Sequence, residues 1–572
     1  MTINKKDVIK LLEKVAIYLE LKGENPFKIS AYRKAAQALE RDDRSLTDIE
    51  DFKKIKGIGK GTSAVIDEYI ENESSETLKQ LEKEVPNGLI PLLNLPGLGG
   101  KKLAKFYQEL GVTDADSLKE ACKSGKVESL EGFGKKSADK ILAALEDANT
   151  RPERLPIAFM LPIAERIETY LKEIQVIHDY SRAGSLRRMR ETVKDIDFII
   201  ASESPEIVRD ALLELENIKE VIAKGETKVS ITLDDVFDVN VDFRIVAPNE
   251  FASTLHHFTG SKDHNVAMRQ LAKSNGEKIN EYGVDIEETG ETITFQDEKQ
   301  FFEHFGLQFI PPEVRENTGE VEAFREHVSL IYLEDIRGDL HMHTTWSDGA
   351  QSLEEMVNRA REKNYEYITI TDHSKFLQVA NGLNETRLRK QREEINRLNE
   401  KYDDIHIFAG VEMDILPDGS LNFDDTFLQE MDFVIGAIHS SFNQSQEKIM
   451  NRLYAALDNP YVSLIAHPTG RLIGRRTGYN VDVDKLIQRA KETGTALEIN
   501  ANPNRLDLSA EWARKVQSAG VKIAISTDAH NYNMLDHMTY GVRTARKGWI
   551  KKETVLNTWS KEKLIDFMNR TK

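Results

Sequence analysis

Histidine and acidic residues recur at the ends of short apolar runs after residue 336. Seven such runs occur, and six of them end in, or lead directly into, a side chain that can bind a metal ion. His341 and His343 are two residues apart on an extended segment, as are Asp528 and His530, so the members of each pair point to the same face. Imidazole and carboxylate together suit zinc, manganese or iron, and nine such ligands are too many for one ion. The candidate ligands are His341, His343, Asp348, His373, Glu412, His439, His467, Asp528 and His530.

Glu412 lies in the middle of this series and is a candidate bridge between ions. Two or three ions that share its carboxylate would account for the number of ligands. A cluster of this kind activates water and neutralises a phosphate, which is the chemistry of phosphoester hydrolysis. The alternative is that the histidines are scattered without a common role. Six of the chain's 14 histidines belong to the series, however, so the sequence favours a metal centre.

Three aspartates further upstream form a second candidate metal site. Asp195 and Asp197 are two residues apart on a predicted strand, so both carboxylates face one way while Ile196 and Phe198 face the core. Asp242 lies on one face of the predicted strand VNVDFRIV. If the two strands are neighbours, the three carboxylates converge and can hold two Mg²⁺ ions through oxygen ligands. Such a pair can activate a 3′-hydroxyl group and neutralise a triphosphate.

A small-residue turn precedes these aspartates. Gly184 and Ser185 can present backbone N–H groups to a phosphate. Arg187 and Arg188 follow directly, and guanidinium groups are natural phosphate partners. The segment therefore indicates a nucleotide-binding turn beside the candidate magnesium site.

The runs that carry the histidines define the elements that must position them. Strand-like runs that alternate with helical stretches are typical of a parallel sheet. Seven such units predict a closed or nearly closed α/β barrel, in which the chemistry lies at the C-terminal ends of the strands. The runs are GDLHMH, YITITDH, IHIFAGVE, FVIGAIH, VSLIAH, TALEIN and VKIAISTD.

The chain before the barrel divides into three further patterns. Residues 151–250 contain the strand-like runs IDFII, VSIT and FDVNVDFRIV, and residues 251–315 are mixed. A polar segment over 316–335 is interpreted as a linker. Residues 1–150 are predicted to form short helices separated by glycine-bearing turns.

Three of those turns resemble one another, and each has lysine close by. Backbone N–H groups in such hairpins grip phosphates without reading sequence, and the lysines add positive charge. A single turn of this kind is more often an ordinary helix–helix connection, but three in 150 residues favour DNA binding. The candidate DNA-binding residues are Gly57, Gly59, Lys60, Gly97, Gly99, Gly132 and Gly134.

The bulk composition constrains the partners only weakly. The net charge of −18 argues mildly against nucleic acid, but net charge reports on solubility and steering, and a local basic groove can still bind phosphates. The single cysteine, Cys122, excludes intramolecular disulfides and suits a reducing cytoplasm. The N-terminus has the pattern of an amphipathic helix and not of a signal peptide, and no apolar run is long enough to cross a bilayer.

The order HMH, TDHS, GVEMD, AIHSS, AHP and STDAH resembles the PHP family (polymerase and histidinol phosphatase) over residues 336–572. The resemblance implies a distorted seven-stranded barrel with up to three ions, manganese or zinc, and no family ligand is missing. It implies one ion held by His341, His343, Glu412 and Asp528, a second by Glu412, His439 and His467, and a third by Asp348, His373 and His530.

Residues 1–315 resemble DNA polymerase beta and its family X relatives. The resemblance rests on SAYRKAA, the Gly-Ile-Gly hairpin, GSLRR, the three aspartates, FTGS, Met268-Arg269 and INEY. It implies that Asp195 and Asp197 bind both magnesium ions, and that Asp242 binds the catalytic one and helps to deprotonate the primer terminus. It also implies nucleotide contacts from Ser185, Arg188 and Arg154 to the triphosphate, from Phe258 to Gly260 around the sugar, and from Asn265 and Arg269 to the minor-groove edge of the nascent pair.

Two positions depart from the eukaryotic family pattern near the nucleotide. His257 replaces the aromatic residue that precedes Phe258, and Lys262 replaces an acidic residue near the incoming base. We expect Lys262 to add positive charge beside the nucleotide and to strengthen its binding.

A third departure concerns the helical front of the chain. The front domain of polymerase beta carries a lyase that cleaves a 5′-deoxyribose phosphate through a lysine Schiff base. Counted from the Gly57–Gly59 hairpin, that lysine is Val65 here, which cannot form an imine. We therefore predict weak or absent lyase activity, measured as the adduct that borohydride traps on a 5′-deoxyribose phosphate. Strong trapping would contradict the prediction.

Together these patterns predict a multidomain α+β and α/β protein similar to the bacterial family X polymerases with a C-terminal PHP domain. The expected parts are an N-terminal helical DNA-binding domain (1–75), a helix-hairpin-helix fingers region (76–150), a nucleotidyltransferase palm (151–250), a thumb (251–315), a linker (316–335) and a PHP phosphoesterase domain (336–572).

The expected function is bifunctional DNA repair in the bacterial cytoplasm, close to the nucleoid. A monomer would fill gaps in primed DNA with deoxynucleoside triphosphates, using Mg²⁺, and its barrel would act as a 3′–5′ exonuclease or end phosphoesterase, with AP endonuclease activity as a further option. One alternative is a nuclease whose polymerase half only binds DNA. The other is a polymerase whose barrel is purely structural. Asp242→Asn and His341→Ala discriminate the three, because the bifunctional hypothesis requires each to remove one activity and spare the other.

Overall fold

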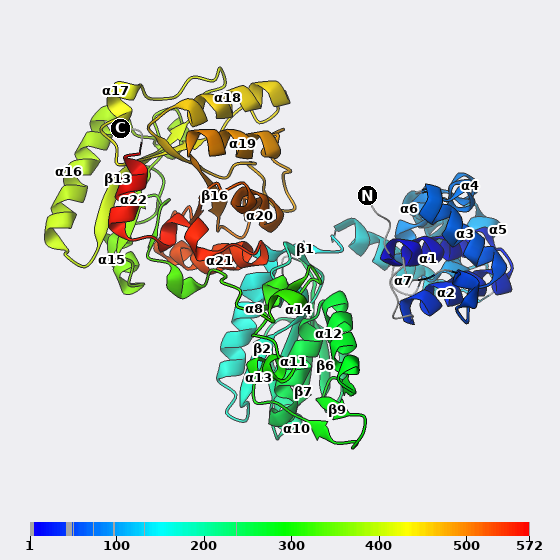
Figure 1. Ribbon diagram of the computed structural model, residues 1–572. Coiled ribbons are helices and arrows are strands. Elements are labelled where there is room, and N and C mark those ends of the chain that lie inside the picture. Colours follow the sequence, from blue (N-terminus) through cyan, green and yellow to red (C-terminus); the bar gives the residue numbers. More distant parts are fainter. Residues whose placement is uncertain are drawn as a thin grey trace. The chain divides into compact units, whose positions relative to one another are not determined.

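The chain forms two compact units, Met1–Glu153 and Arg154–Lys572, in a computed structural model (Figure 1). The structure describes residues 5–41, 49, 51–72, 74–94, 98–130, 132–150, 152–235 and 237–570.

The first unit is helical. The predicted N-terminal amphipathic helix is present as α1, whose buried face includes Leu12, Val15 and Leu19 and packs against α2. Helix α5 ends at Gly111, whose positive φ of 69° closes the helix as a left-handed cap. The elements are α1 (Lys5–Lys22), α2 (Pro26–Arg41), η2 (Phe52–Lys54), α3 (Lys60–Asn72), α4 (Glu76–Glu84), η3 (Asn87–Leu89), η4 (Pro91–Asn94), α5 (Gly100–Leu110), α6 (Ala115–Lys123) and α7 (Lys135–Thr150).

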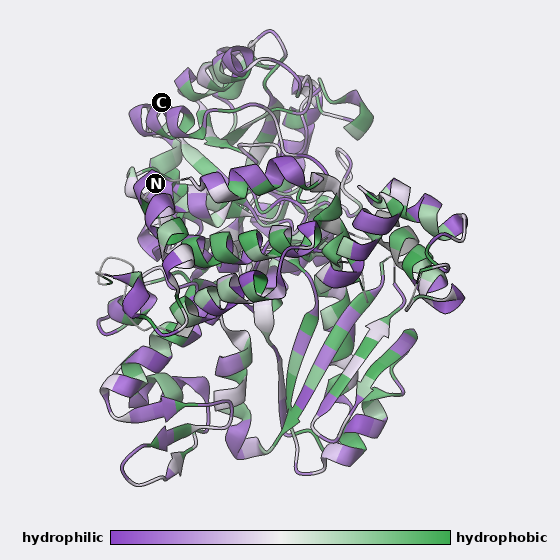
Figure 2. Cartoon of the chain, turned by 90° about the vertical axis from the view of Figure 1, so that its right-hand side faces the viewer, coloured by the Kyte–Doolittle hydropathy of each residue, from purple (hydrophilic) through white to green (hydrophobic). Residues whose placement is uncertain are grey.

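The second unit opens with a five-stranded sheet in the order β2-β4-β7-β6-β5. Buried and partly buried residues alternate along β7, and Figure 2 shows hydrophobic and hydrophilic bands along strands of this sheet. β4 and β7 pair in parallel and place Asp197 opposite Asp242. The elements of this part are β1 (Leu155–Pro156), α8 (Ile157–Lys172), β2 (Asp179–Arg182), α9 (Gly184–Arg187), β3 (Thr192–Val193), β4 (Ile196–Ala201), α10 (Pro205–Leu212), β5 (Ile218–Lys224), β6 (Lys228–Leu233) and β7 (Val239–Val246).

A smaller helical part with a three-stranded antiparallel sheet follows the five-stranded sheet. The polar segment that we interpreted as a linker is folded into this part. Glu320 is buried 2.8 Å from His264 Nδ1, and Phe324 and Leu330 join the hydrophobic cluster of Met268. A few buried anchors therefore hold a segment whose composition is polar. The elements are η5 (Pro248–Glu250), α11 (Phe251–Thr259), α12 (Lys262–Ser274), β8 (Glu277–Ile279), β9 (Val284–Ile286), β10 (Thr292–Ile293), α13 (Glu298–His304), η6 (Pro312–Val314), α14 (Glu320–Ala323) and η7 (Leu333–Asp335).

The rest of the chain forms a nearly closed barrel of seven parallel strands in sequence order, β11 to β17. A parallel bridge between Met342 and Ala529 links the segments that follow the first and last strands. The seven predicted strands and the predicted barrel are therefore confirmed. The strands are β11 (Gly338–Asp339), β12 (Tyr367–Ile370), β13 (His406–Asp414), β14 (Phe433–Ala437), β15 (Val462–Ile465), β16 (Ala496–Asn500) and β17 (Ile523–Ser526).

Both faces of the barrel strands are buried, which explains why they form continuous apolar runs in the sequence. One hydrophobic cluster, which includes Tyr367, Phe408 and Leu464, fills the interior. Tyr367 donates a hydrogen bond to the Trp559 carbonyl at the N-terminal end of the strands, so that end is closed. The helices are α15 (Leu353–Glu362), η8 (Gln378–Ala380), α16 (Glu385–Lys401), α17 (Asp425–Leu428), α18 (Gln446–Asp458), α19 (Val483–Thr493), α20 (Ala510–Ser518), η9 (Tyr532–His537), α21 (Met538–Lys547), η10 (Lys552–Thr554), η11 (Leu556–Thr558) and α22 (Lys561–Met568).

Among the described residues, no helix is long and apolar enough to span a membrane.

Candidate metal centres

The nine predicted ligands of the barrel meet at the C-terminal ends of its strands. Glu412 lies within β13, and the other eight lie in segments that follow a strand. Eight of the nine, all but His467, offer ligand atoms that form three groups, and within each group the atoms lie within 4.8 Å of one another. The groups are His341, His343 and Asp528; His373, Glu412 and His439; and His343, Asp348, His373 and His530.

Glu412 is the centre of the cluster. Its Oε1 lies 3.1 Å from Nε2 of both His439 and His467. Its Oε2 lies 3.4 Å from His341 Nε2 and 2.8 Å from His373 Nδ1. Yet this buried Oε2 has no hydrogen-bond partner within the described part of the chain. Buried polar atoms are normally satisfied, so a carboxylate whose Oε1 contacts two imidazoles while its Oε2 faces others without a hydrogen bond fits a bridging ligand of divalent cations.

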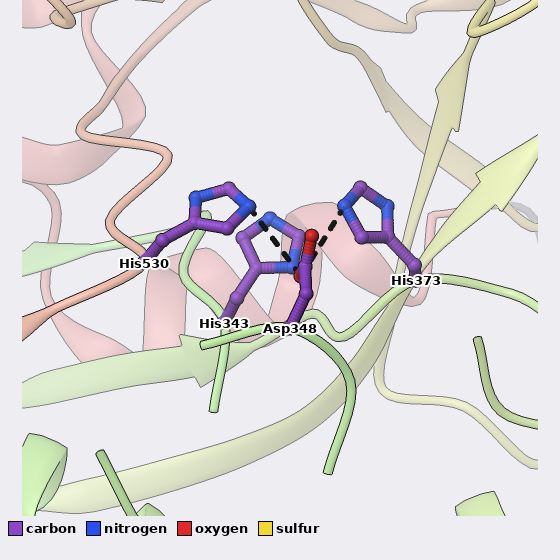
Figure 3. Close-up of side chains that lie close together, drawn as sticks. All are labelled: His343, Asp348, His373 and His530. Atoms are coloured by element: carbon purple, nitrogen blue, oxygen red, sulfur yellow. Dashed lines mark ion pairs between the residues drawn. The ribbon is translucent and has the colours of Figure 1, made fainter. Parts of the chain in front are cut away.

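The third group is the most open one. In Figure 3 the Asp348 carboxylate lies between the rings of His373 and His530, and its Oδ1 is 3.7 and 3.5 Å from their Nε2 atoms. The side chains of Asp348 and His530 are 36% and 33% exposed, whereas His341, His343 and Glu412 are buried. A substrate can therefore approach the cluster from the side of Asp348 and His530.

The electrostatics of the cluster favour cations. Burial would raise the pKa of Glu412, but the imidazoles of His439, His341 and His373 outweigh this effect and hold its pKa well below the usual range. Burial would lower the pKa of His439, but the carboxylates of Glu412 and Asp414 raise it to about 10. In the metal-free protein, protons on histidines such as His439 therefore balance part of the negative charge of the carboxylates, and a metal ion that binds must displace these protons.

The sequence reasoning missed the carboxylates that orient these histidines. Glu498 Oε1 lies 2.8 Å from His341 Nδ1, and Asp414 Oδ1 lies 2.9 Å from His439 Nδ1. Such contacts at Nδ1 turn Nε2 toward the cluster and fix the ring. A signal was present for both: Asp414 is two residues from Glu412 on one strand, and Glu498 lies in TALEIN, the single run without a predicted ligand.

The three aspartates of the second candidate site also come together. Asp197 and Asp242 are paired residues of β4 and β7, and Asp195 directly precedes β4. Burial, together with the charges of Asp195 and Asp242, raises the pKa of Asp197 to about 7. Gly184 packs so closely that an added Cβ would lie 2.2 Å from Asp197 Oδ2. The predicted phosphate turn therefore adjoins the carboxylates.

The raised pKa of Asp197 predicts a pH-dependent stability of the metal-free protein. Its ordinary pKa is 3.8, so the folded state retains a proton that the unfolded state releases. This contribution is fully present below about pH 4 and is lost as the pH rises to about 7. We expect Asp197→Asn to raise the melting temperature at pH 8 by roughly 2–4 °C or more, measured by thermal unfolding in a chelator. An identical pH slope in the variant and the native protein would contradict this prediction.

The nucleotide candidates fall into two sets. Ser185 lies in α9, and Arg188 follows it, with Nε 3.2 Å from Glu316 Oε1 and Nη1 2.5 Å from the Thr259 carbonyl. Gly260 adjoins Arg188, because an added Cβ would lie 3.3 Å from Nη1. By contrast, Arg154 donates to Thr192 of β3. The second set lies farther along the chain. The Phe258 ring stacks 4.0 Å from the Arg244 guanidinium, and Lys262 is the first residue of α12. Asn265 donates to the His257 carbonyl, and both Arg269 and His257 line a 680 Å³ cavity.

Arg187, also predicted as a phosphate partner, is engaged with residues of the protein. Its guanidinium donates to the Thr259 hydroxyl and to Glu298, which also binds the buried Arg315. The two arginines oppose the effect of burial and hold the pKa of Glu298 well below its usual range. Arg187 therefore belongs to a buried ion network, and its role as a phosphate partner stays a prediction.

The helical front presents its glycine turns at helix starts. Gly59, Gly99 and Gly134 directly precede the helices α3, α5 and α7, and Lys60 is the first residue of α3. A Cβ added at any of these three glycines would meet nothing within 4 Å. Gly57 and Gly132 have φ values of 115° and 89°, which favour glycine. Gly97 lies outside the described residues. Val65, at the expected lyase position, is buried in α3.

Comparison with known proteins identifies the family. A relative named "DNA polymerase/3'-5' exonuclease PolX" from Bacillus subtilis (strain 168) is 58% identical over 567 residues, which cover 99% of this chain and 100% of the relative. The chain belongs to the bacterial family X DNA polymerases with a C-terminal PHP domain. Parts of this family X chain match a Helix-hairpin-helix domain (3–75), a SAM-like Helix-hairpin-helix tandem (89–147), the DNA polymerase beta thumb (254–316) and the PHP domain (339–502).

The barrel of this family X polymerase also has separate relatives. A protein named "Probable phosphatase" from Thermoanaerobacter sp. (strain X514) is 29% identical over 234 residues, 38% of this chain and 89% of the relative. Another of that name from Acetivibrio thermocellus is 27% identical over 247 residues, 41% of this chain and 95% of the relative. The predicted family and fold class are confirmed, and the PHP domain together with the ligand clusters implies dependence on divalent metal ions.

Proposed function

We propose that this chain is a DNA-directed DNA polymerase and a 3′–5′ exonuclease, with a separate site for each reaction. The observation that carries the proposal is the presence of two convergent ligand clusters, the three aspartates and the nine barrel ligands, in a chain 58% identical to a relative named for both activities. The helical front would hold gapped or primer-template DNA through Gly57, Gly59, Lys60, Gly97, Gly99, Gly132 and Gly134. The part boundaries predicted from the sequence remain our proposal.

In the polymerase reaction, the 3′-hydroxyl oxygen attacks the α-phosphorus of a deoxynucleoside triphosphate and pyrophosphate leaves. Asp195, Asp197 and Asp242 would hold Mg²⁺, which when bound neutralises the triphosphate and favours deprotonation of the hydroxyl. Asp242 would assist removal of that proton. Ser185 and Arg188 would bind the phosphates, with Arg154 in support. Phe258, Gly260 and Lys262 would surround the nucleotide, and Asn265 and Arg269 would contact the nascent pair.

In the barrel reaction, water attacks the terminal phosphodiester and a nucleotide leaves. Glu412 and its eight partners would hold up to three ions, manganese or zinc, which when bound supply the activation of water and the neutralisation of phosphate charge. Glu498 and Asp414 would keep His341 and His439 in the productive orientation. Asp348 and His530, the exposed members, would face the DNA end.

The finer setting is base excision or end repair by a monomer near the nucleoid, in the bacterial cytoplasm. Cleavage at abasic sites and removal of 3′ blocking groups fit the same phosphodiester chemistry, and the phosphatase names of the barrel's relatives favour the second of these.

A single assay tests both halves of the proposal. A gapped duplex, labelled at the 5′ end of the primer, is incubated with deoxynucleoside triphosphates and with Mg²⁺, Mn²⁺ or a chelator. We expect extension across the gap when nucleotides are present, stepwise shortening when they are omitted, and neither with the chelator. Release of phosphate without shortening would instead identify the barrel as a phosphatase, and shortening without extension would exclude the polymerase half.

A further inference from the structure

Helix α21 carries three positively charged side chains that extend away from the barrel and contact the polymerase part of the chain. Arg543, Arg546 and Lys547 share one helix face, because they are spaced three and four residues apart. The same helix is held tightly to the barrel: a Cβ added at Gly541 would lie 2.6 Å from the Ala501 Cβ and 2.5 Å from Ile525 Cγ2. The barrel therefore fixes the position of the three cations.

The first contact of these cations is Glu313, whose side chain is only 1% exposed. Arg543 Nε lies 2.5 Å from its Oε1, and Arg546 donates to both carboxylate oxygens at 3.1 Å. Burial alone would raise the pKa of Glu313, but the two guanidinium groups hold it at about 2. The carboxylate is therefore charged at every working pH, and it anchors α21 to η6.

The second contact is the backbone beside the phosphate turn. Arg543 Nη2 donates to the Arg187 carbonyl at 2.5 Å, and Lys547 Nζ donates to the Arg188 carbonyl at 3.1 Å. Both carbonyls belong to the segment that begins at Gly184 and ends at the proposed triphosphate ligand Arg188. Hydrogen bonds from charged donors are stronger than neutral ones, so α21 fixes this segment from the side of the barrel.

The third contact is with Glu316, the carboxylate that pairs with the Arg188 guanidinium. Glu316 Oε1 lies 3.2 Å from Arg188 Nε and 3.1 Å from Lys547 Nζ, so the two cations share one carboxylate. If Lys547 lost its charge, Glu316 would be balanced mainly by Arg188, with Arg190 more distant at 3.8 Å. Arg188 would then bind a triphosphate less strongly, because it would have to give up a tighter internal ion pair.

We propose that Lys547, supported by Arg543, is a positioning residue for nucleotide binding by the polymerase. It holds the Arg188 backbone and occupies Glu316, which keeps the Arg188 guanidinium available to the triphosphate. The inference rests on the proposed role of Arg188 in nucleotide binding. Its consequence is that the PHP barrel completes the polymerase site through α21, independently of the hydrolytic activity of the barrel.

The test compares Lys547→Met, which keeps the length of the side chain but removes its charge, with Lys547→Arg in the full chain. Gap filling is measured at varied nucleotide concentration, and shortening of the labelled primer is measured without nucleotide. For Lys547→Met we expect the nucleotide KM to rise roughly tenfold, with kcat changed by less than about threefold and shortening unaffected. Lys547→Arg should restore most of the affinity. The matched control is Lys515→Met, because Lys515 lies on α20 and pairs with Asp484 at 3.2 Å.

A second variant keeps the test decisive if Lys547→Met is less stable. Adding Glu316→Gln to Lys547→Met removes the unbalanced carboxylate and should recover part of the lost nucleotide affinity. An unchanged KM in Lys547→Met, or an equal loss of gap filling and shortening that Lys547→Arg does not rescue, would overturn the inference. Arg188→Ala separates this outcome from a failure of the proposed function. If Arg188→Ala also leaves KM unchanged, the proposed role of Arg188 is wrong; if it raises KM while Lys547→Met does not, only the inference fails.

Discussion

Glu412→Gln is expected to reduce shortening of a 3′ end by at least about a thousandfold while gap filling stays within about twofold. The substitution preserves size and removes one charge from a buried carboxylate that lies 3.1 Å from two imidazoles and 2.8 Å from a third. Without that charge, the position between the ligand groups loses its anionic ligand, so the site attracts divalent cations less strongly. Metal content of the purified protein, measured by mass spectrometry, should fall in parallel with the hydrolytic rate.

Two comparisons make this result interpretable. Glu498 is not one of the nine ligands but orients two of them, through His341 Nδ1 at 2.8 Å and the His467 backbone N–H at 2.6 Å, so for Glu498→Gln we expect a smaller loss of roughly 10- to 100-fold. His341→Ala removes a ligand and should resemble Glu412→Gln. Hydrolysis that survives Glu412→Gln would exclude the barrel as the site of the reaction. Loss of gap filling in the same variant would instead assign the barrel a structural role.

The barrel was predictable because its strands are buried on both faces. Such strands appear in the sequence as continuous apolar runs, and parallel topology then requires their C-terminal residues to meet at one end. His341, His373 and Glu412 could therefore be placed at one site before any contact was known. The common direction of Asp195 and Asp197 was predictable for a similar reason, since residues two apart on a strand share a face. The pairing of β4 with β7, which brings Asp242 beside them, was only a condition of that prediction.

Contacts between distant polar residues were not predictable in this way. Arg543 and Lys547 have the sequence pattern of a solvated basic helix end, and their partners Glu313 and Glu316 lie about 230 positions earlier. Hydrophobic periodicity reports which face of an element is buried, but it carries no signal for ion pairs across such a separation. The buried contacts within residues 316–335 could not be predicted for the same reason, because one buried hydrogen bond between His264 and Glu320 and a few apolar anchors decide how this segment packs.

Asp242→Asn is expected to abolish gap filling, by at least about a thousandfold, and to leave shortening of the 3′ end within about twofold. The variant removes one of three carboxylates and the group proposed to help deprotonate the 3′-hydroxyl. It also leaves Lys228, now 3.4 Å from Asp242 Oδ2, without its partner, so positive charge would oppose Mg²⁺ at the site. Single-nucleotide insertion on a gapped duplex at varied Mg²⁺ concentration measures both the rate and the apparent metal affinity.

Asp238→Asn is the matched control, since it makes the same chemical change directly before β7. Asp238 pairs with Lys219 at 2.6 Å on the surface, where such ion pairs contribute little to stability, so both activities should remain within about twofold of the native protein. Insertion at the native rate by Asp242→Asn would show that the three aspartates are not the polymerase site. Loss of shortening in Asp242→Asn, but not in Asp238→Asn, would show that the two reactions share catalytic groups. If the two clusters act independently, Asp242→Asn must lose gap filling and keep shortening. Asp242 belongs to β7, whereas the nine barrel ligands all follow or lie within the strands β11 to β17.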